Sequence, residues 1–63
     1  MPILTVEMWE GRNIEVKKKL VKDLTDVVST DLSCPKDAVT VVLKDVPKYN
    51  WGIGGELASE KFQ

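Results

Sequence analysis

The sequence predicts an α+β fold in which a β-α-β unit with parallel strands is followed by a short C-terminal hairpin. Three features support this prediction: an alternating apolar stretch at residues 2–9, a helical pattern at residues 13–32, and a β-branched run at residues 39–45. A strand, a long helix and a second strand form a right-handed crossover, so the two strands run parallel. At 63 residues the chain is a single domain.

The first strand and the helix follow from local patterns. Pro2 is tolerated at the first position of a strand, where its missing N–H costs least. Asn13 is a good helix N-cap, and apolar residues then recur at steps of three and four through residues 13–32. Pro35 ends the helix, because the residue before a proline disfavours the α conformation.

The second strand and the tail differ in character. Residues 39–45 are almost continuously apolar, as expected for a strand covered on both faces. Three glycines within residues 51–55 predict a turn or small hairpin in which the backbone packs closely or takes positive φ. Residues 56–61 fit a short helical turn or an extended cover.

The composition excludes several classes of function. The net charge is −1 and acidic and basic residues are interleaved, which argues against nucleic-acid binding. No apolar run is long enough for a membrane span, and no signal peptide is evident. With no histidine and one cysteine, the chain can form neither an internal disulfide nor a Cys/His metal site. Cys34 as a lone thiol fits a reducing, cytoplasmic setting.

The small size predicts association with other copies. A domain of this length buries only about 60% of its unfolded surface, and such chains usually need disulfides, metals or oligomerisation. Two parallel strands and one helix also leave sheet faces and edges uncovered. We therefore expect a homo-oligomer.

The N-terminal pair Met1-Pro2 has the clearest chemical consequence. An initiator methionine before a small residue is a good candidate for removal, which leaves Pro2 as a terminal secondary amine. A terminal amine has an ordinary pKa of about 7.7–8.0, and apolar surroundings or a nearby cation lower it toward the range of efficient proton transfer. Pro2 is therefore a candidate general base and acid. The alternative is that it marks N-terminal processing only.

The remaining candidates are Arg12 and an apolar wall of Trp9, Trp51 and Ile53. Arg12 is the only arginine and stands just before the helix, where its guanidinium can bind a substrate carboxylate in bidentate fashion. The alternative is a surface arginine. Trp51 on a glycine-rich turn suits a pocket wall or a subunit interface, and both roles can hold at once.

Together these residues resemble the 4-oxalocrotonate tautomerases, small members of the tautomerase superfamily. The resemblance covers the whole chain and is carried by Met1-Pro2, by Glu10-Gly11-Arg12 at the strand-to-helix junction, and by residues 51–59. It implies a tautomerase/MIF-like fold completed by oligomerisation. In that fold, dimers with a four-stranded sheet commonly assemble as a trimer of dimers, a homohexamer. It also implies that no metal and no organic cofactor is used.

The resemblance implies a keto–enol tautomerase acting on unsaturated 2-hydroxy or 2-oxo acids, such as 2-hydroxymuconate, in the degradation of aromatic compounds. By position, Pro2 corresponds to the catalytic base, once Met1 is removed. Arg12 corresponds to the residue that holds the distal carboxylate, reaching the site from a neighbouring subunit. Trp51 stands where the family usually has phenylalanine, as a wall that keeps the pKa of the amine low.

One position departs from the family pattern. The best-known members carry a second arginine on the second strand, and the matching residue here is Thr40, which brings no charge. By analogy with the loss of one oxyanion-hole donor, this lowers the rate by about 10²–10³. Lys44 shares the strand face but lies about 13 Å further along. Two alternatives stay open: a proline-dependent hydratase or dehalogenase of unsaturated acids, and a non-catalytic or heteromeric subunit.

Overall fold

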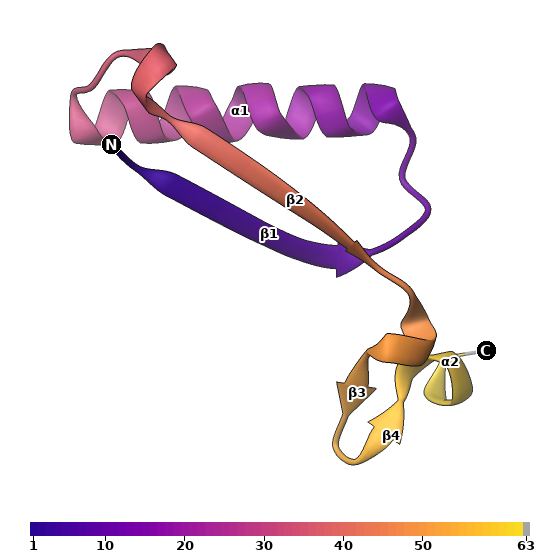
Figure 1. Cartoon of the computed structure of the whole chain (residues 1–63). Helices are drawn as coiled ribbons and strands as arrows, with labels where there is room; N and C mark the ends of the chain where they lie inside the picture. The colour runs from indigo at the N-terminus through magenta and orange to yellow at the C-terminus, as the bar shows by residue number, and fades with distance from the viewer. Residues whose placement is uncertain (63) are drawn as a thin grey trace.

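The structure is a computed structural model that describes residues 1–62 (Figure 1). A β-α-β unit forms its long part, and a small hairpin with a terminal helical turn extends from one end. The elements are, in order, β1 (Ile3–Trp9), α1 (Ile14–Leu32), the 3-10 turn η1 (Lys36–Ala38), β2 (Thr40–Val46), the 3-10 turn η2 (Lys48–Asn50), β3 (Gly52–Ile53), β4 (Glu56–Leu57) and α2 (Ala58–Lys61).

The two long strands pair in parallel, as predicted, from Ile3 opposite Thr40 to Trp9 opposite Val46. The second strand begins and ends one residue later than residues 39–45. The reason is local: the N–H of Val39 donates to Lys36 O at 3.0 Å and closes η1. The ladder therefore starts at Thr40.

The helix agrees with the predicted range 13–32 to within one residue, and a left-handed residue two positions before Pro35 ends it. Asn13 Oδ1 accepts a hydrogen bond from the N–H of Val16 at 2.9 Å, which confirms the N-cap. At the other end Ser33 takes the left-handed conformation with φ 53°, and Cys34 N–H donates to Ser29 O at 3.1 Å. The helix is therefore closed at both ends. No helix of residues 1–62 is both long and apolar enough to cross a membrane.

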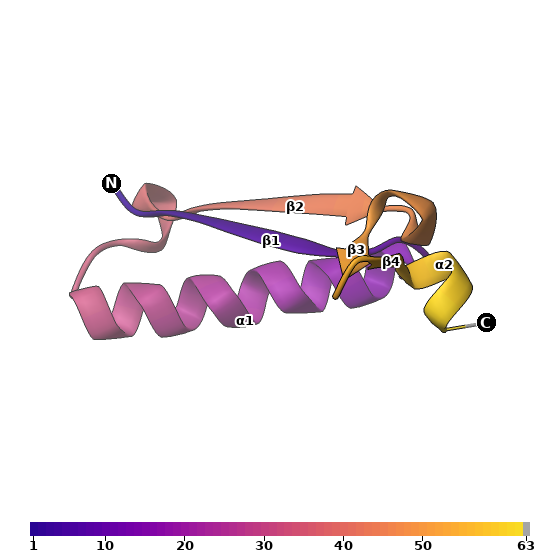
Figure 2. The same ribbon diagram turned by 90° about the horizontal axis from the view of Figure 1, so that it is seen from below.

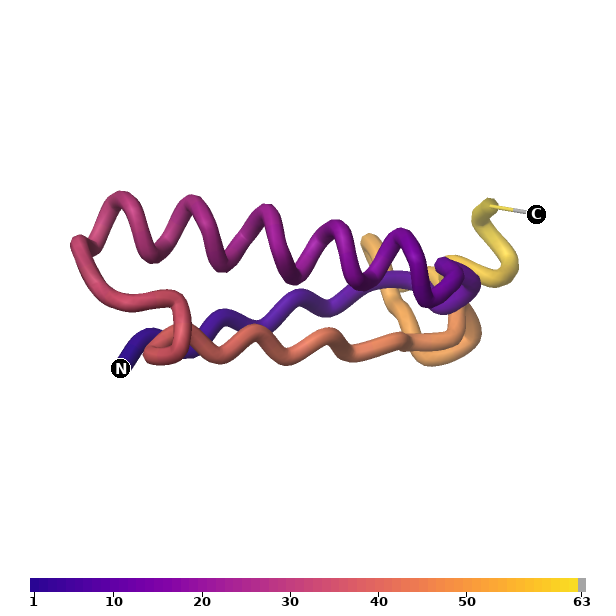
Figure 3. The backbone as a smooth tube through the Cα atoms, turned by 90° about the horizontal axis from the view of Figure 1, so that it is seen from above, coloured from indigo at the N-terminus to yellow at the C-terminus, as the bar shows by residue number. Residues whose placement is uncertain are grey.

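The helix and the sheet form two layers (Figure 2 and Figure 3). Alternate residues of each strand, among them Val6 and Leu43, are half-buried on the face toward α1. The opposite face is open, with Ile3 69% and Val42 38% exposed. A cover on both faces of β2, predicted from its sequence, is therefore not supplied by the described chain itself.

The helix also presents more apolar surface than one sheet covers. At 100° per residue, Val16, Leu20 and Val27 fall within an arc of about 40° and form a ridge along α1. Val16 is 48% and Val27 is 57% exposed. We call these three residues the open ridge. It lies on the flank of the helix away from Val21, which lines a groove against β2.

The isolated chain is not compact. The Cα radius of gyration is 14.7 Å, against about 11 Å for a compact domain of this length. The accessible surface is 4752 Å², whereas a folded monomer of this mass exposes about 4,100 Å². Among the described residues only Ala58 is fully buried. A core of this kind requires a partner surface.

The C-terminal hairpin has the predicted glycine turn. Gly54 and Gly55 have φ of 60° and 89°, the positive values that a type I′ hairpin turn requires at both central positions. Ile53 pairs with Glu56 across this turn, and the N–H of Ala58 donates to Trp51 O at 2.7 Å. This hydrogen bond joins the residue after β4 to the residue before β3 and closes the hairpin.

Candidate functional site

Pro2 and Thr40 lie together at one end of the sheet. The N–H of Thr40 donates to Pro2 O at 3.0 Å, which is the first hydrogen bond of the ladder. Pro2 is half-buried and Thr40 is exposed. Met1 is 92% exposed, so its side chain contributes almost nothing to packing, and its removal leaves β1 intact.

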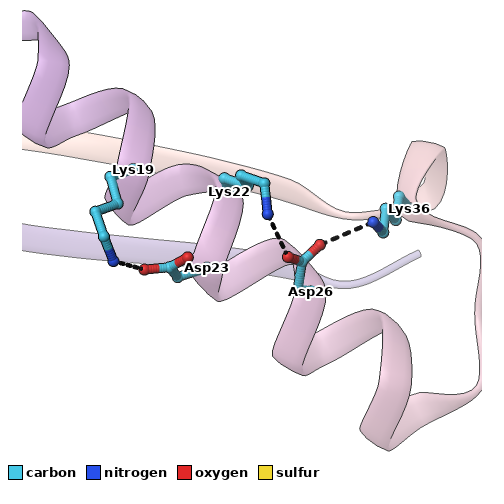
Figure 4. A network of polar contacts seen from close by, with 5 residues as sticks. All are labelled: Lys19, Lys22, Asp23, Asp26 and Lys36. Atoms are coloured by element: carbon cyan, nitrogen blue, oxygen red, sulfur yellow. Dashed lines mark hydrogen bonds and ion pairs between the residues drawn. The ribbon is translucent and has the colours of Figure 1, made fainter.

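Lysines along α1 and in η1 have acidic partners (Figure 4). Asp26 of α1 accepts hydrogen bonds from Lys22 and Lys36, both at 3.0 Å, and the second of these ties η1 to the helix. Lys36 and then Lys22 hold the pKa of Asp26 below its ordinary value, and Asp26 raises the pKa of Lys22. Lys19 is paired with Asp23 at 2.6 Å. Only the Lys36–Asp26 contact among these joins the turn that leads into β2 to the helix.

Three aromatic rings gather at the other end of the sheet. Trp9, the last residue of β1, meets Trp51 edge to face, with ring centroids 6.0 Å apart and an interplanar angle of 77°. The ring centroids of Phe62 and Trp9 lie 5.6 Å apart, and the two ring planes are tilted relative to each other. Ile53 is half-buried in β3, two residues beyond Trp51. Two of the three residues predicted as an apolar wall, Trp9 and Trp51, are therefore in contact within one chain.

Arg12 belongs to this same end. Gly11 has φ 121°, a conformation that favours glycine, and it turns the chain from β1 toward the helix. Arg12 Nη1 donates to Trp9 O at 2.9 Å, and the side chain is otherwise exposed. Lys48 of η2 places its Nζ 4.8 Å from the centre of the Trp9 ring. Arg12 and Lys48 therefore both contact Trp9, one at its backbone carbonyl and the other at its ring.

The indole N–H of Trp9 is buried and has no acceptor among residues 1–62. An unsatisfied buried donor costs about 1–3 kcal/mol. Within residues 1–62, the Trp9 side chain is therefore held by its ring contacts and not by a hydrogen bond from its indole N–H.

The predicted site residues fall into two groups that one chain does not bring together. Pro2 precedes β1 and Arg12 follows it (Figure 1). Seven strand residues at about 3.3 Å each separate the two groups by about 23 Å. A small acid cannot touch both ends of one chain. Contact with both groups requires two copies.

Two members of the aromatic end were missed by reasoning from the sequence, namely Lys48 and Phe62. Lys48 reaches Trp9 only because η2, which begins after Pro47, folds the chain back. Phe62 follows a single helical turn, and no periodic pattern identifies it. A groove of about 520 Å³ between α1 and β2, with Val21 and Leu43 in its lining, contains none of the predicted site residues.

The fold and the two ends of the sheet define a class of small α+β subunits built from a β-α-β unit and a glycine hairpin, with proline as second residue. The family model described as tautomerase enzyme matches residues 2–61. The chain therefore belongs to the tautomerase family, and it is an enzyme of the isomerase class.

Individual relatives agree with this assignment. The chain is 40% identical over 60 residues to a 2-hydroxymuconate tautomerase of Pseudomonas putida, covering 95% of both chains. A solved structure of 4-oxalocrotonate tautomerase isozymes from Methylibium petroleiphilum is 35% identical and has a TM-score of 0.91, covering 98% of this chain and 100% of that one. A heterohexamer 4-oxalocrotonate tautomerase from Chloroflexus aurantiacus is 30% identical with a TM-score of 0.89, covering 95% and 97%. The predicted family and fold are confirmed.

Proposed function

We propose that this enzyme is a cofactor-independent keto–enol tautomerase of unsaturated 2-hydroxy or 2-oxo acids, in which the amine of Pro2 transfers the proton. The observation that carries the proposal is the division of the site: Pro2 and Thr40 stand at one end of β1, and Arg12 with the aromatic wall at the other. A second copy that runs in the opposite direction places the two ends side by side. Membership of the tautomerase family supports the proposal that this arrangement is the tautomerase site.

The reaction needs only one group that accepts and returns a proton. Without Met1, the neutral amine of Pro2 accepts the proton of the enol hydroxyl while electron density moves along the conjugated chain. The protonated amine then delivers that proton to carbon. The proton lost from oxygen is gained at carbon, so no oxidant, reductant or metal enters the balance.

Arg12 and the aromatic wall serve binding. The guanidinium keeps donors free beyond its bond to Trp9 O and can fork onto a carboxylate. Trp9, Trp51 and Ile53 line the conjugated chain of the substrate with apolar surface, and they exclude water from the amine of a neighbouring copy. Such dry surroundings favour the neutral amine, which is the form that accepts a proton.

The assembly in this proposal is a homohexamer built as a trimer of dimers. It is supported by the open face of the sheet, by the open ridge of α1 and by the excess of exposed surface. A cytoplasmic location and a role in the degradation of aromatic compounds belong to the same proposal, with 2-hydroxymuconate as the reference substrate.

A second assembly is favoured by Thr40, which supplies no charge beside Pro2. We propose as the alternative that the chain joins a divergent chain carrying the missing cation. A heterohexamer is the assembly of the related Chloroflexus aurantiacus enzyme. Native mass spectrometry with a turnover assay separates the two: an active assembly of this chain alone argues against the heteromer.

The proposed chemistry is tested by one pair of measurements. Intact mass determines whether Met1 is absent, and the fall in dienol absorbance follows the conversion of 2-hydroxymuconate. We expect turnover by the Met-free protein and its loss in Pro2→Ala. Equal rates in Pro2→Ala and the wild type would refute the role of the amine.

A further inference from the structure

Two cations at the aromatic end stand apart from the rest. Residues 1–62 contain all nine lysines and arginines, and within this part of the chain only Arg12, Lys44 and Lys48 form no ion pair. Lys44 lies opposite Glu7 in the strand register, so an acid faces it. Arg12 and Lys48 lie outside the strands, and both contact Trp9.

The contacts at Trp9 leave these two cations available. Arg12 uses one N–H on Trp9 O, at 2.9 Å, and a guanidinium has five donors. Lys48 Nζ sits 4.8 Å above the centre of the ring, an arrangement that orients the ammonium without neutralising it.

Among the side chains of residues 1–62, none at the Pro2 end of the sheet is an unpaired cation. Thr40 beside Pro2 is uncharged, and Lys36, four residues before it, is bound to Asp26 at 3.0 Å (Figure 4). The charge of an assembled site is therefore asymmetric. An acid enters with its carboxylate toward Trp9 and with its other end toward Pro2.

We propose that Lys48 is a specificity-determining residue that binds the remote carboxylate of the substrate together with Arg12. The substrate class that fits is a conjugated 2-hydroxy or 2-oxo acid that carries a further carboxylate at the end of the chain remote from the hydroxyl or oxo group. This inference rests on the proposed function for its reaction, while the binding it describes requires no turnover.

Binding is tested with two unreactive probes of the same carbon chain, the dicarboxylate muconate and the monocarboxylate sorbate. Quenching of the fluorescence of Trp9 and Trp51 reports their occupancy in the wild-type assembly. Lys48→Gln is expected to raise the Kd of sorbate by about threefold to tenfold, whereas Lys48→Arg keeps it near the wild-type value. Lys44→Gln is the matched control and leaves binding unchanged.

The asymmetry makes a second prediction with the same probes. Because the unpaired cationic side chains that face the site in residues 1–62 lie at one end only, the second carboxylate of muconate adds little, and the two Kd values agree within about threefold. Added salt weakens sorbate binding by the wild type more than by Lys48→Gln, since one screened charge is missing from the variant.

The inference would be overturned if Lys48→Gln and the wild type bound sorbate equally well, including the case in which the variant only loses thermal stability. It would also be overturned if muconate bound ten times more tightly than sorbate, or if neither probe bound. Turnover of 2-hydroxymuconate with an unaffected Lys48→Gln variant would refute this inference and keep the proposed function. Lys48-dependent binding without any turnover would support this inference and refute the proposed function.

Discussion

Val27→Asp tests whether the open ridge of α1 is an interface between copies. Val27 is 57% exposed in the single chain, so within that chain the aspartate meets mostly water. In an assembly that covers the ridge, the same carboxylate is buried without a partner. We expect the variant to keep its helix and to lose its oligomeric state.

The size of the effect follows from the exposed fraction. Full burial of a valine side chain contributes about 1.5–3 kcal/mol, so the exposed 57% of Val27 accounts for about 1–2 kcal/mol per copy. In a two-fold contact both copies lose this term, so the dimer is weakened by about 2–3 kcal/mol and its Kd rises by about 30- to 150-fold. Burial of the charge adds to this loss.

Sedimentation equilibrium over a range of concentrations measures this change, and circular dichroism checks the helix. Lys18→Glu is the control, because residue 18 lies on the side of α1 opposite Val27 and the substitution changes the charge by twice as much. Equal dissociation constants for Val27→Asp and the wild type would refute the assignment of the ridge. A monomeric wild type would do so as well.

Trp9→Ala is expected to lower the free energy of unfolding by about 2–4 kcal/mol, because two ring contacts disappear. Trp9→Phe keeps an aromatic ring at this position and removes an N–H with no acceptor in residues 1–62. Denaturant titration should therefore give it a free energy of unfolding within about 1 kcal/mol of the wild type. Asp26 has a pKa lowered mainly by Lys36, so its contribution to stability is present above the pKa of the unfolded state and is lost as pH falls through the lower folded pKa. Thermal melts at falling pH should therefore show a weaker acid dependence in Asp26→Asn than in the control Asp31→Asn; equal profiles would contradict this. Thr40→Arg adds a cation beside Pro2 and should raise kcat/KM for 2-hydroxymuconate by about tenfold or more, whereas no gain would show that charge at this position does not limit the rate.

The elements were predictable because their determinants are local. Asn13 caps the helix through a bond to the N–H of Val16, and Gly54 and Gly55 take the positive φ that their position demands. The parallel direction of the two long strands followed from the length of the crossover. The register that sets Thr40 opposite Ile3 did not follow from the sequence pattern.

The rest depended on geometry that a sequence does not display. Lys48 meets Trp9 because a single 3-10 turn reverses the chain, and no periodicity marks such a contact. The continuous apolar run of β2 indicated two covered faces, yet Val42 is 38% exposed because its second cover is not part of the described chain. A hydrophobic sequence pattern indicates that a residue is buried, but it does not indicate whether the same chain or another copy of the chain covers it.

The central claim is that one site takes its base from one copy and its carboxylate anchor from another. Mixing two inactive variants tests this most directly: Pro2→Ala and Arg12→Ala are unfolded, combined in equal amounts and refolded together. Random assembly then gives about a quarter of the sites both intact residues, so about a quarter of the wild-type turnover of 2-hydroxymuconate should return. If Pro2 and Arg12 acted within one chain, every site would carry one lesion, and no activity would return.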